Sequence, residues 1–288
     1  MWITRVAPFL LPAVLFQSGI FALVSPLPLF ILSLKKKPWL SLIALTVNIA
    51  LVLAAGFHSK TIGVVVFWFA VGIFFPYLIR KSGKIQLSFV LCLVYMLSML
   101  LIGLYSLSHQ VQMGIIEYVK SELSSLMDHL IALPDSPVKT LVEEQGRDAL
   151  FKDLMTELPS GIVMALIFGL WINLLFASQL IKGFLSKNFW ANYRVPELVI
   201  WPTLICAGLF IWSEHALYYI GLNGLKILLV FYGFQGLSVL SYVLNHYKIF
   251  GFVRALLFTT AIFLVMPLVL SLGFFDLWFD FRRKLGQT

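Results

Sequence analysis

The sequence contains very little charge. Only 12% of its 288 residues are Asp, Glu, Lys or Arg, whereas 60% are hydrophobic and the mean hydropathy is +0.95. Soluble domains usually have about 25% charged and about 45–50% apolar residues. The scarcity of charge excludes a soluble globular enzyme and a disordered chain. A chain this apolar is expected to be a polytopic integral membrane protein.

Cysteine and enzyme motifs are also scarce. The two cysteines, Cys92 and Cys206, lie in apolar runs without a neighbouring Cys or His at metal-ligand spacing, so they are expected in the core and not in a disulfide framework. The chain has no HExxH pair, no Walker A or GxGxxG loop and no Gly-x-Ser-x-Gly elbow. We therefore expect no enzymatic activity, no metal site and no cofactor.

The few charges are unevenly placed. Nine of the thirteen acids lie between His109 and Leu158, where four bases leave a net charge of −5 within a chain of net charge +8. The chain has an isoelectric point near 9.5, a value also found in nucleic-acid-binding proteins. Here the bases lie between apolar runs. This pattern is typical of membrane proteins whose orientation in the bilayer is determined by cytoplasmic Lys and Arg. We expect the lipid bilayer, and no nucleic acid, as a partner.

Eight charge-free apolar runs are candidates for membrane spans, because a hydrocarbon core of about 30 Å needs about 20 helical residues. They are residues 6–34, 39–57, 61–79, 85–108, 158–181, 198–213 (extendable to 220), 227–247 and 255–275. The over-long first run is interrupted by Pro26 and Pro28, each of which removes a helical N–H. The interruption predicts either a broken helix that lines a cavity or a kink near the interface. The sequence thus predicts an all-α bundle of about eight spans.

The acidic stretch 109–158 is too polar to cross the membrane. Apolar residues recur at helical spacing from Ile115 to Ile131, which predicts an amphipathic helix. Ser136-Pro137 predicts the start of a second helix, which Gly146 ends. We expect an extramembrane helical insertion between spans four and five of one integral domain, residues 1–288. The insertion either lies in the interface, covers the bundle as a lid, or extends the adjoining spans into solvent.

Basic residues predict the orientation. Eleven bases fall on alternate loops and hence on one side of the membrane: Lys35–Lys37, Arg80, Lys81, Lys84, Lys182, Lys187, Arg194, Lys248 and Arg254. The positive-inside rule makes that side cytoplasmic and places 109–158 outside. The terminal Arg282-Arg283-Lys284 contradicts this assignment, because eight spans put it on the opposite side. Either the terminus is an exception or one span is miscounted.

Small residues form a stripe in the fifth run. Gly161, Ala165, Gly169, Asn173 and Ala177 recur every four residues, a spacing that lets two helix backbones approach closely. Asn173 is available for an interhelical hydrogen bond and is also a candidate for the wall of a polar cavity. The stripe predicts helix packing first and a cavity second.

Polar residues share one face of the seventh run. Gln235, Ser238, Ser241 and Asn245 repeat at intervals of three, three and four, and Tyr232 precedes them on that face. Such a face suits a solute site or hydrated cleft, and equally well suits hydrogen bonds between helices.

A carboxylate near the end of the sixth run is a further candidate. Glu214, which precedes His215, either contributes to the solute cavity as an intramembrane charge or reaches the interface.

The C-terminal run from Gly273 to Arg283 resembles the closing motif of the YybS-like family, bacterial multi-pass membrane proteins classed as a domain of unknown function. Residues 25–29, 194–199 and 234–237 resemble other stretches of the family pattern in order. The resemblance implies a location in the bacterial inner membrane. The family is distantly similar to the S-components of energy-coupling-factor transporters, which implies a bundle that binds a small molecule and works with a membrane or transporter partner protein.

The same motif has a physical interpretation. Aromatic side chains around Trp278 form a belt typical of the membrane interface, while Asp276, Asp280 and Arg282 face headgroups or each other. Asp276 and Asp280 are a like-charge pair at i, i+4 that a nearby base would relieve. The motif predicts either membrane anchoring or a platform for a partner.

These features support two main hypotheses; a third, an intramembrane enzyme, would need a carboxylate–His constellation that converges on Glu214. The first is a small-solute-binding or transport-associated protein whose cavity is lined by the broken first run and the polar face of 235–245. The second is a membrane scaffold or assembly protein that binds partners through 109–158 or the C-terminal motif.

Overall fold

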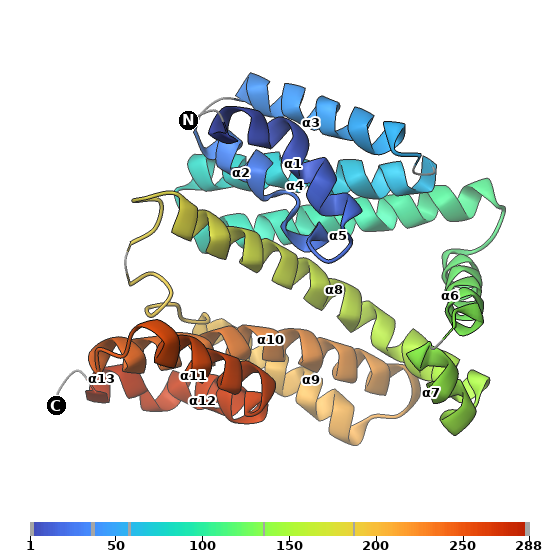
Figure 1. Ribbon diagram of the computed structural model, residues 1–288. Helices are drawn as coiled ribbons and strands as arrows, with labels where there is room; N and C mark the ends of the chain where they lie inside the picture. Colours follow the sequence, from blue (N-terminus) through green and yellow to red (C-terminus); the bar gives the residue numbers. More distant parts are fainter. Residues whose placement is uncertain (1–2, 36–37, 57–58, 135, 187, 286–288) are drawn as a thin grey trace. The chain divides into compact units, whose positions relative to one another are not determined.

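The computed structural model describes residues 3–35, 38–56, 59–134, 136–186 and 188–285, and all regular structure in these ranges is helical. Lys36, Lys37 and Lys187, three of the bases that predict the orientation, lie outside the described residues. The chain divides into two compact units, one of residues 1–155 and 165–184 and the other of residues 156–164 and 185–288. Each unit is described by itself (Figure 1).

The first unit contains eight helices or parts of helices. They are α1 (Ile3–Gln17), α2 (Leu27–Leu34), α3 (Pro38–Ala54), α4 (Ser59–Ser82), α5 (Ile85–Gln110), α6 (Ile115–Ala132), α7 (Pro137–Gln145) and most of α8 (Arg147–Leu180). Asn48 of α3 joins α1 to α3. Its Nδ2 donates to the carbonyl of Pro8 at 2.9 Å, and its Oδ1 accepts from Ala13 N at 2.9 Å. Pro12 has no N–H for the Pro8 carbonyl, so Asn48 supplies the missing donor.

The run 6–34 forms two helices. α1 ends at Gln17, the short 3-10 helix η1 covers Ala22–Val24, and Pro26 is the N-cap of α2. Pro28 follows at the second helical position, where a missing N–H costs no hydrogen bond. The Pro26 carbonyl packs against Gly72 of α4, where a Cβ atom would lie 2.6 Å from its oxygen. Both prolines therefore help to start α2, and Pro26 packs it onto α4.

Helices α6 and α7 lie in the acidic stretch 109–158. The Ser136 hydroxyl accepts from Val138 N and caps α7, and Gly146, with a φ of 84°, separates α7 from α8. Arg147 at the start of α8 pairs with Asp128 of α6 at 2.8 Å. A location of this stretch outside the membrane stays a prediction.

Four helices are long and apolar enough to cross a membrane. They are residues 62–82 of α4, all of α5, all of α8 and residues 216–246 of α10. A bent helix pair at residues 251–279 raises the number to five if it is one span. The prediction of an all-helical membrane protein is confirmed at this level, and the prediction of about eight spans is not. The runs 6–34, 39–57 and 198–213 form shorter apolar helices.

The second unit is built around α10. It contains residues 156–164 of α8, η2 (Glu197–Val199), α9 (Ile200–Trp212), α10 (His215–His246), α11 (Gly251–Phe263), α12 (Met266–Phe279) and α13 (Phe281–Leu285). A Cβ at Gly273 of α12 would lie 1.9 Å from the Tyr232 carbonyl oxygen of α10. A Cβ at Gly236 would lie 2.0 Å from the Val269 carbonyl oxygen. Glycine at both positions lets the backbones of α10 and α12 touch.

The run 255–275 does not form one straight helix, which corrects its prediction as a simple span. α11 and α12 meet at a break of two residues, Leu264 and Val265, with a bend of 93°. The helices have 13 and 14 residues. At 1.5 Å per residue each is about 20 Å long, less than the ~30 Å of a hydrocarbon core.

Both ends of this bent pair lie beside the C-terminal part of α10. Arg254, in the first turn of α11, donates to Asn245 of α10 at 2.6 Å. Arg282, just after α12, donates to Ser238 of α10 at 3.2 Å. Met266 at the start of α12 and Gly273 in its middle lie opposite Gly233 and Tyr232 of α10. The pair therefore enters and leaves at one end of α10.

Candidate functional site

A buried polar network connects α10, α12, α13 and the segment before η2. At its centre, Arg282 Nη2 and Asp276 Oδ2 are 2.5 Å apart, with 4% and 0% of their side chains exposed. Gln235 donates to Asp276 at 2.9 Å and accepts from Val195 N at 2.9 Å. The Phe281 N–H donates to the other Asp276 oxygen at 3.1 Å. The carboxylate thus receives three hydrogen bonds, which offset its loss of water.

Arg282 also holds the segment before η2. Its Nη1 lies 3.2 Å from the Ala191 carbonyl oxygen and 2.8 Å from that of Tyr193. The Ser238 hydroxyl donates to the Tyr193 carbonyl at 3.0 Å. The Nε–H of Arg282 is buried and has no acceptor among the described residues. Burial raises the pKa of the half-buried Tyr193 side chain to about 12.

The predicted polar face of α10 points into the second unit. Tyr232, Gln235, Ser238 and Ser241 are all buried. The Tyr232 hydroxyl shares a hydrogen bond of 3.2 Å with a threonine hydroxyl of α9. Ser241 and Asn245 accept from the guanidinium group of Arg254. In the described residues, these polar groups bond to other parts of the same unit.

The two carboxylates of the C-terminal motif have different partners. Asp276 does not face lipid headgroups, since Arg282 neutralises it inside the unit. Asp280 pairs with Arg194 at 2.7 Å, with 32% and 54% of the two side chains exposed. Burial by itself raises the pKa of Asp280. The hydrogen bond and charge of Arg194, together with Arg283 N–H and the Arg282 charge, hold that pKa below its ordinary value. Each carboxylate thus has its own base.

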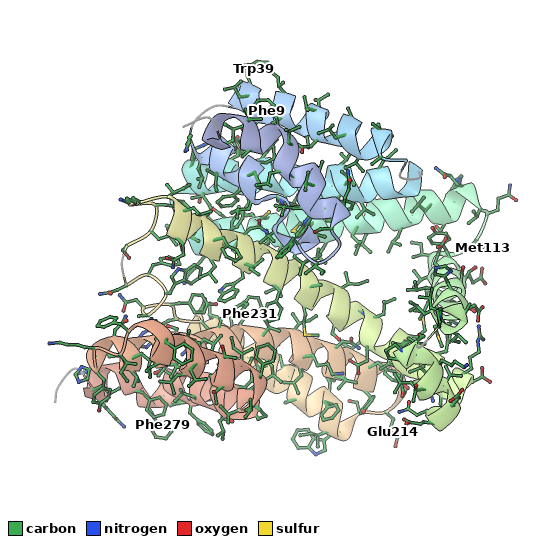
Figure 2. The ribbon with its side chains drawn as sticks, viewed as in Figure 1. Phe9, Trp39, Met113, Glu214, Phe231 and Phe279 are labelled. Atoms are coloured by element: carbon green, nitrogen blue, oxygen red, sulfur yellow. The ribbon has the colours of Figure 1, made fainter. Side chains whose placement is uncertain are left out.

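The aromatic residues of this motif are largely on the surface. Phe275, Trp278 and Phe279 are exposed, and Figure 2 shows Phe279 at the outer edge of its helix. Exposed aromatic side chains next to charged residues are typical of a membrane interface.

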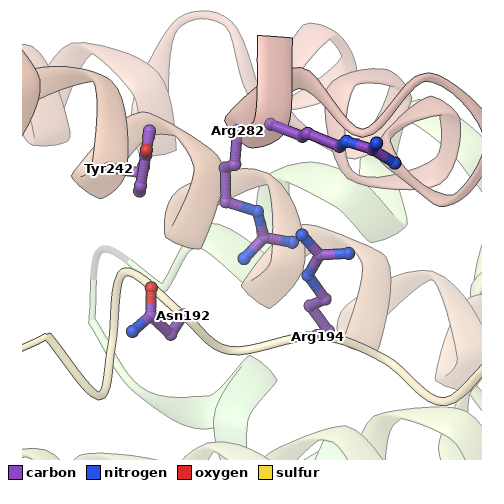
Figure 3. A pocket seen from close by; sticks show the side chains of 5 residues that line it. Asn192, Arg194, Tyr242 and Arg282 are labelled. Atoms are coloured by element: carbon purple, nitrogen blue, oxygen red, sulfur yellow. The ribbon is translucent and has the colours of Figure 1, made fainter. Parts of the chain in front are cut away.

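A pocket opens beside the buried network. It has a volume of about 340 Å³ and is lined by Asn192, Arg194, Tyr242, Arg282 and Arg283. Figure 3 shows the guanidinium groups of Arg194 and Arg282 pointing toward one another. The sequence indicated Arg194 and Arg283 as charges that orient the chain, and Arg282 also as part of the C-terminal motif. Their convergence was missed because 88 residues separate Arg194 from Arg282.

Comparison with known families identifies the chain. The family described as "Predicted membrane protein (DUF2232)" matches residues 9–277. The chain belongs to this family. The match covers both units and confirms the YybS-like resemblance. No curated protein and no solved structure matches the chain.

In this DUF2232 member, the stripe of small residues makes close contact at Gly169. A Cβ there would lie 2.3 Å from the ring of Trp68. Ala165 is exposed, and apart from neighbouring residues and the backbone of α8 itself, no atom of the described residues lies within 4 Å of a Cβ built at Gly161. Asn173 donates to the Gly169 carbonyl at 2.7 Å and to a carbonyl of η1 at 2.8 Å. Its buried Oδ1 has no donor among the described residues.

Glu214 lies at the exposed junction of α9 and α10 (Figure 2). α9 ends at Trp212 because Ser213 and Glu214 are extended, so the apolar run does not continue as one helix to residue 220. The side chain of His215 lies outside what the structure describes. Pro26 and Pro28 belong to the first unit, whereas the polar face of α10 belongs to the second.

Proposed function

We propose that this DUF2232 member binds a small solute, takes part in its transport, and catalyses no reaction itself. The pocket of the second unit is the proposed binding site. The observation that carries the proposal is an opening of about 340 Å³ backed by the buried Arg282. Ligand sites have volumes of about 300–1,000 Å³, and charged groups inside helical membrane bundles commonly mark solute pathways.

The buried network supports this proposal because it makes the pocket wall rigid. Asp276 fixes one end of the Arg282 guanidinium group, and Gln235 fixes Asp276. A ligand therefore meets a side chain whose conformation is already set, which reduces the entropy lost on binding. The likeness to transporter S-components that the sequence resemblance implies suggests the same function, with a membrane or transporter partner protein completing transport.

We place the pocket on the cytoplasmic side of the bacterial inner membrane. Arg194 and Arg254 belong to the predicted cytoplasmic bases, and Arg194 lies in the pocket with Arg282 and Arg283. A re-entrant α11–α12 pair returns the terminal bases to this side. Arg282, Arg283 and Lys284 then lie on the cytoplasmic side, as the positive-inside rule requires. With eight spans, the same residues lay on the opposite side and contradicted the rule.

The test is native mass spectrometry of the purified protein. We expect the wild type to retain a small molecule and Asn192→Trp to lose it, because Asn192 is an exposed pocket residue and the indole ring fills the opening. Asn188→Trp is the matched control, since Asn188 is exposed on the same loop but does not line the pocket. Equal retention by all three proteins contradicts the proposed site.

A scaffold function is the second candidate. The exposed aromatic side chains of Phe275, Trp278 and Phe279 favour it, because aromatic residues are enriched in protein interfaces. If a stable partner protein co-purifies with the wild type and is lost from Trp278→Ala, while no small molecule is recovered, the scaffold function replaces solute binding.

A further inference from the structure

We infer that the pocket selects a phosphate group, which Arg283 binds directly and which the charges of Arg194 and Arg282 attract. This inference rests on the proposed binding function and names the chemical class of its ligand.

The charge of the pocket favours an anion. Of the five described residues that line it, three are arginines and none is acidic. Two carboxylates outside the lining, Asp276 and Asp280, pair with Arg282 and Arg194. Arg283 has no ion-pair partner within the part of the chain that the structure describes. The pocket therefore keeps the net positive charge of Arg283, which attracts an anion.

The hydrogen-bonding groups of the pocket are mainly donors. A guanidinium group presents five N–H donors in a planar fork and no acceptor. Asn192 adds an amide and Tyr242 a hydroxyl. A site for a metal cation or an amine would need carboxylate or carbonyl oxygens in its lining. A neutral solute would leave the charge of Arg283 unmatched.

The arrangement of the hydrogen-bonding groups favours phosphate over carboxylate. Arg283 comes from α13, Asn192 from the loop before η2 and Tyr242 from α10, so hydrogen-bonding groups approach from three elements. The tetrahedral oxygens of phosphate accept hydrogen bonds from several directions, whereas the two carboxylate oxygens lie in one plane. Arginine is also the preferred residue for bidentate phosphate recognition.

Two sources can supply this chemistry, a phosphate-bearing solute and the headgroup of an anionic phospholipid. The test titrates the full-length protein, in uncharged detergent, with inorganic phosphate by calorimetry. A parallel arm uses native mass spectrometry after exposure to phosphatidylglycerol or phosphatidylcholine vesicles.

Arg283→Gln and Lys284→Gln are the matched variants. Both residues are exposed and each change removes one positive charge, but only Arg283 lines the pocket. We expect phosphate affinity to fall about tenfold or more in Arg283→Gln, the effect of losing one charge-assisted hydrogen bond. Lys284→Gln is expected to bind phosphate about as the wild type does, and both variants should keep the wild-type unfolding midpoint.

Each outcome is decisive. Selective loss of phosphate binding in Arg283→Gln supports the inference. If the wild type retains phosphatidylglycerol in preference to phosphatidylcholine and Arg283→Gln loses this preference, the inference is also supported. The phosphate is then assigned to a lipid headgroup. Equal losses in Arg283→Gln and Lys284→Gln overturn it. If the wild type retains a neutral ligand that Asn192→Trp loses, and binds neither phosphate nor phosphatidylglycerol, the inference is overturned. The proposed function stays intact in that case. Recovery of no ligand of any kind overturns both.

Discussion

Replacing Asp276 by Asn tests whether the buried ion pair holds the second unit together. The change preserves the size of the side chain and removes the charge that faces Arg282. Arg282 is only 4% exposed, so water cannot compensate its charge. Breaking a buried pair by removing one partner costs about 3–5 kcal/mol. Since asparagine still offers one acceptor oxygen to Gln235 or Arg282, we expect a loss of about 3 kcal/mol.

Asp280→Asn is the control, with the same substitution four residues further along the motif. Its pair with Arg194 is partly exposed, and pairs of that kind contribute about 0–1 kcal/mol. Asp280 has a φ of 42°, in the left-handed region that asparagine tolerates. We therefore expect Asp280→Asn to cost less than about 1 kcal/mol.

The free energy of unfolding would be measured by titrating the purified protein with a denaturing detergent and following tryptophan fluorescence. Asp276→Asn, Arg282→Gln and the double variant form a thermodynamic cycle. The double variant should cost less than the sum of the single changes, because it leaves no unpaired buried charge. Strict additivity, or equal losses for Asp276→Asn and Asp280→Asn, would refute the reasoning.

Two further predictions concern packing and pH. Gly273→Ala should destabilise the protein by about 1–3 kcal/mol, because its Cβ would lie 1.9 Å from the Tyr232 carbonyl oxygen, whereas Gly103→Ala, with open space around it, should not. Thermal unfolding checks both. Wild-type stability should fall as the pH rises from about 10 to about 12, because Tyr193 loses its proton first in the unfolded chain. Tyr193→Phe should make this fall shallower in unfolding measured across that pH range.

Equal melting temperatures for Gly273→Ala and Gly103→Ala would contradict the close contact between α10 and α12. If the wild type and Tyr193→Phe lose stability in parallel above pH 10, this would contradict the burial of the Tyr193 side chain.

Much of the fold follows from local chemistry. A helix satisfies its own backbone in lipid, so the long apolar runs at 61–79, 85–108, 158–181 and 227–247 predicted α4, α5, α8 and α10. The run 255–275 is equally apolar, but Pro267, at the second position of α12, marks a helix start within it. The sequence prediction did not use this signal and treated the run as one span.

The site, like the fold, has features that local sequence predicts and others that it does not. Helical periodicity determined that Tyr232, Gln235, Ser238 and Ser241 share a face, and all four are buried. The sequence alone did not determine their partners. Gln235 donates a hydrogen bond to Asp276, which lies 41 residues later in the sequence. Arg282 donates one to the carbonyl of Tyr193, which lies 89 residues earlier.

The sequence by itself thus determined the membrane class, the long helices and the residues that share a helix face, because these depend on neighbouring side chains and on the helical repeat. Only the tertiary structure decided that Arg194, Arg282 and Arg283 line one pocket. It also brought the terminal bases to the end of α10 where Arg194 lies. Both results depend on chain segments that are distant in sequence and meet only when α12 packs against α10.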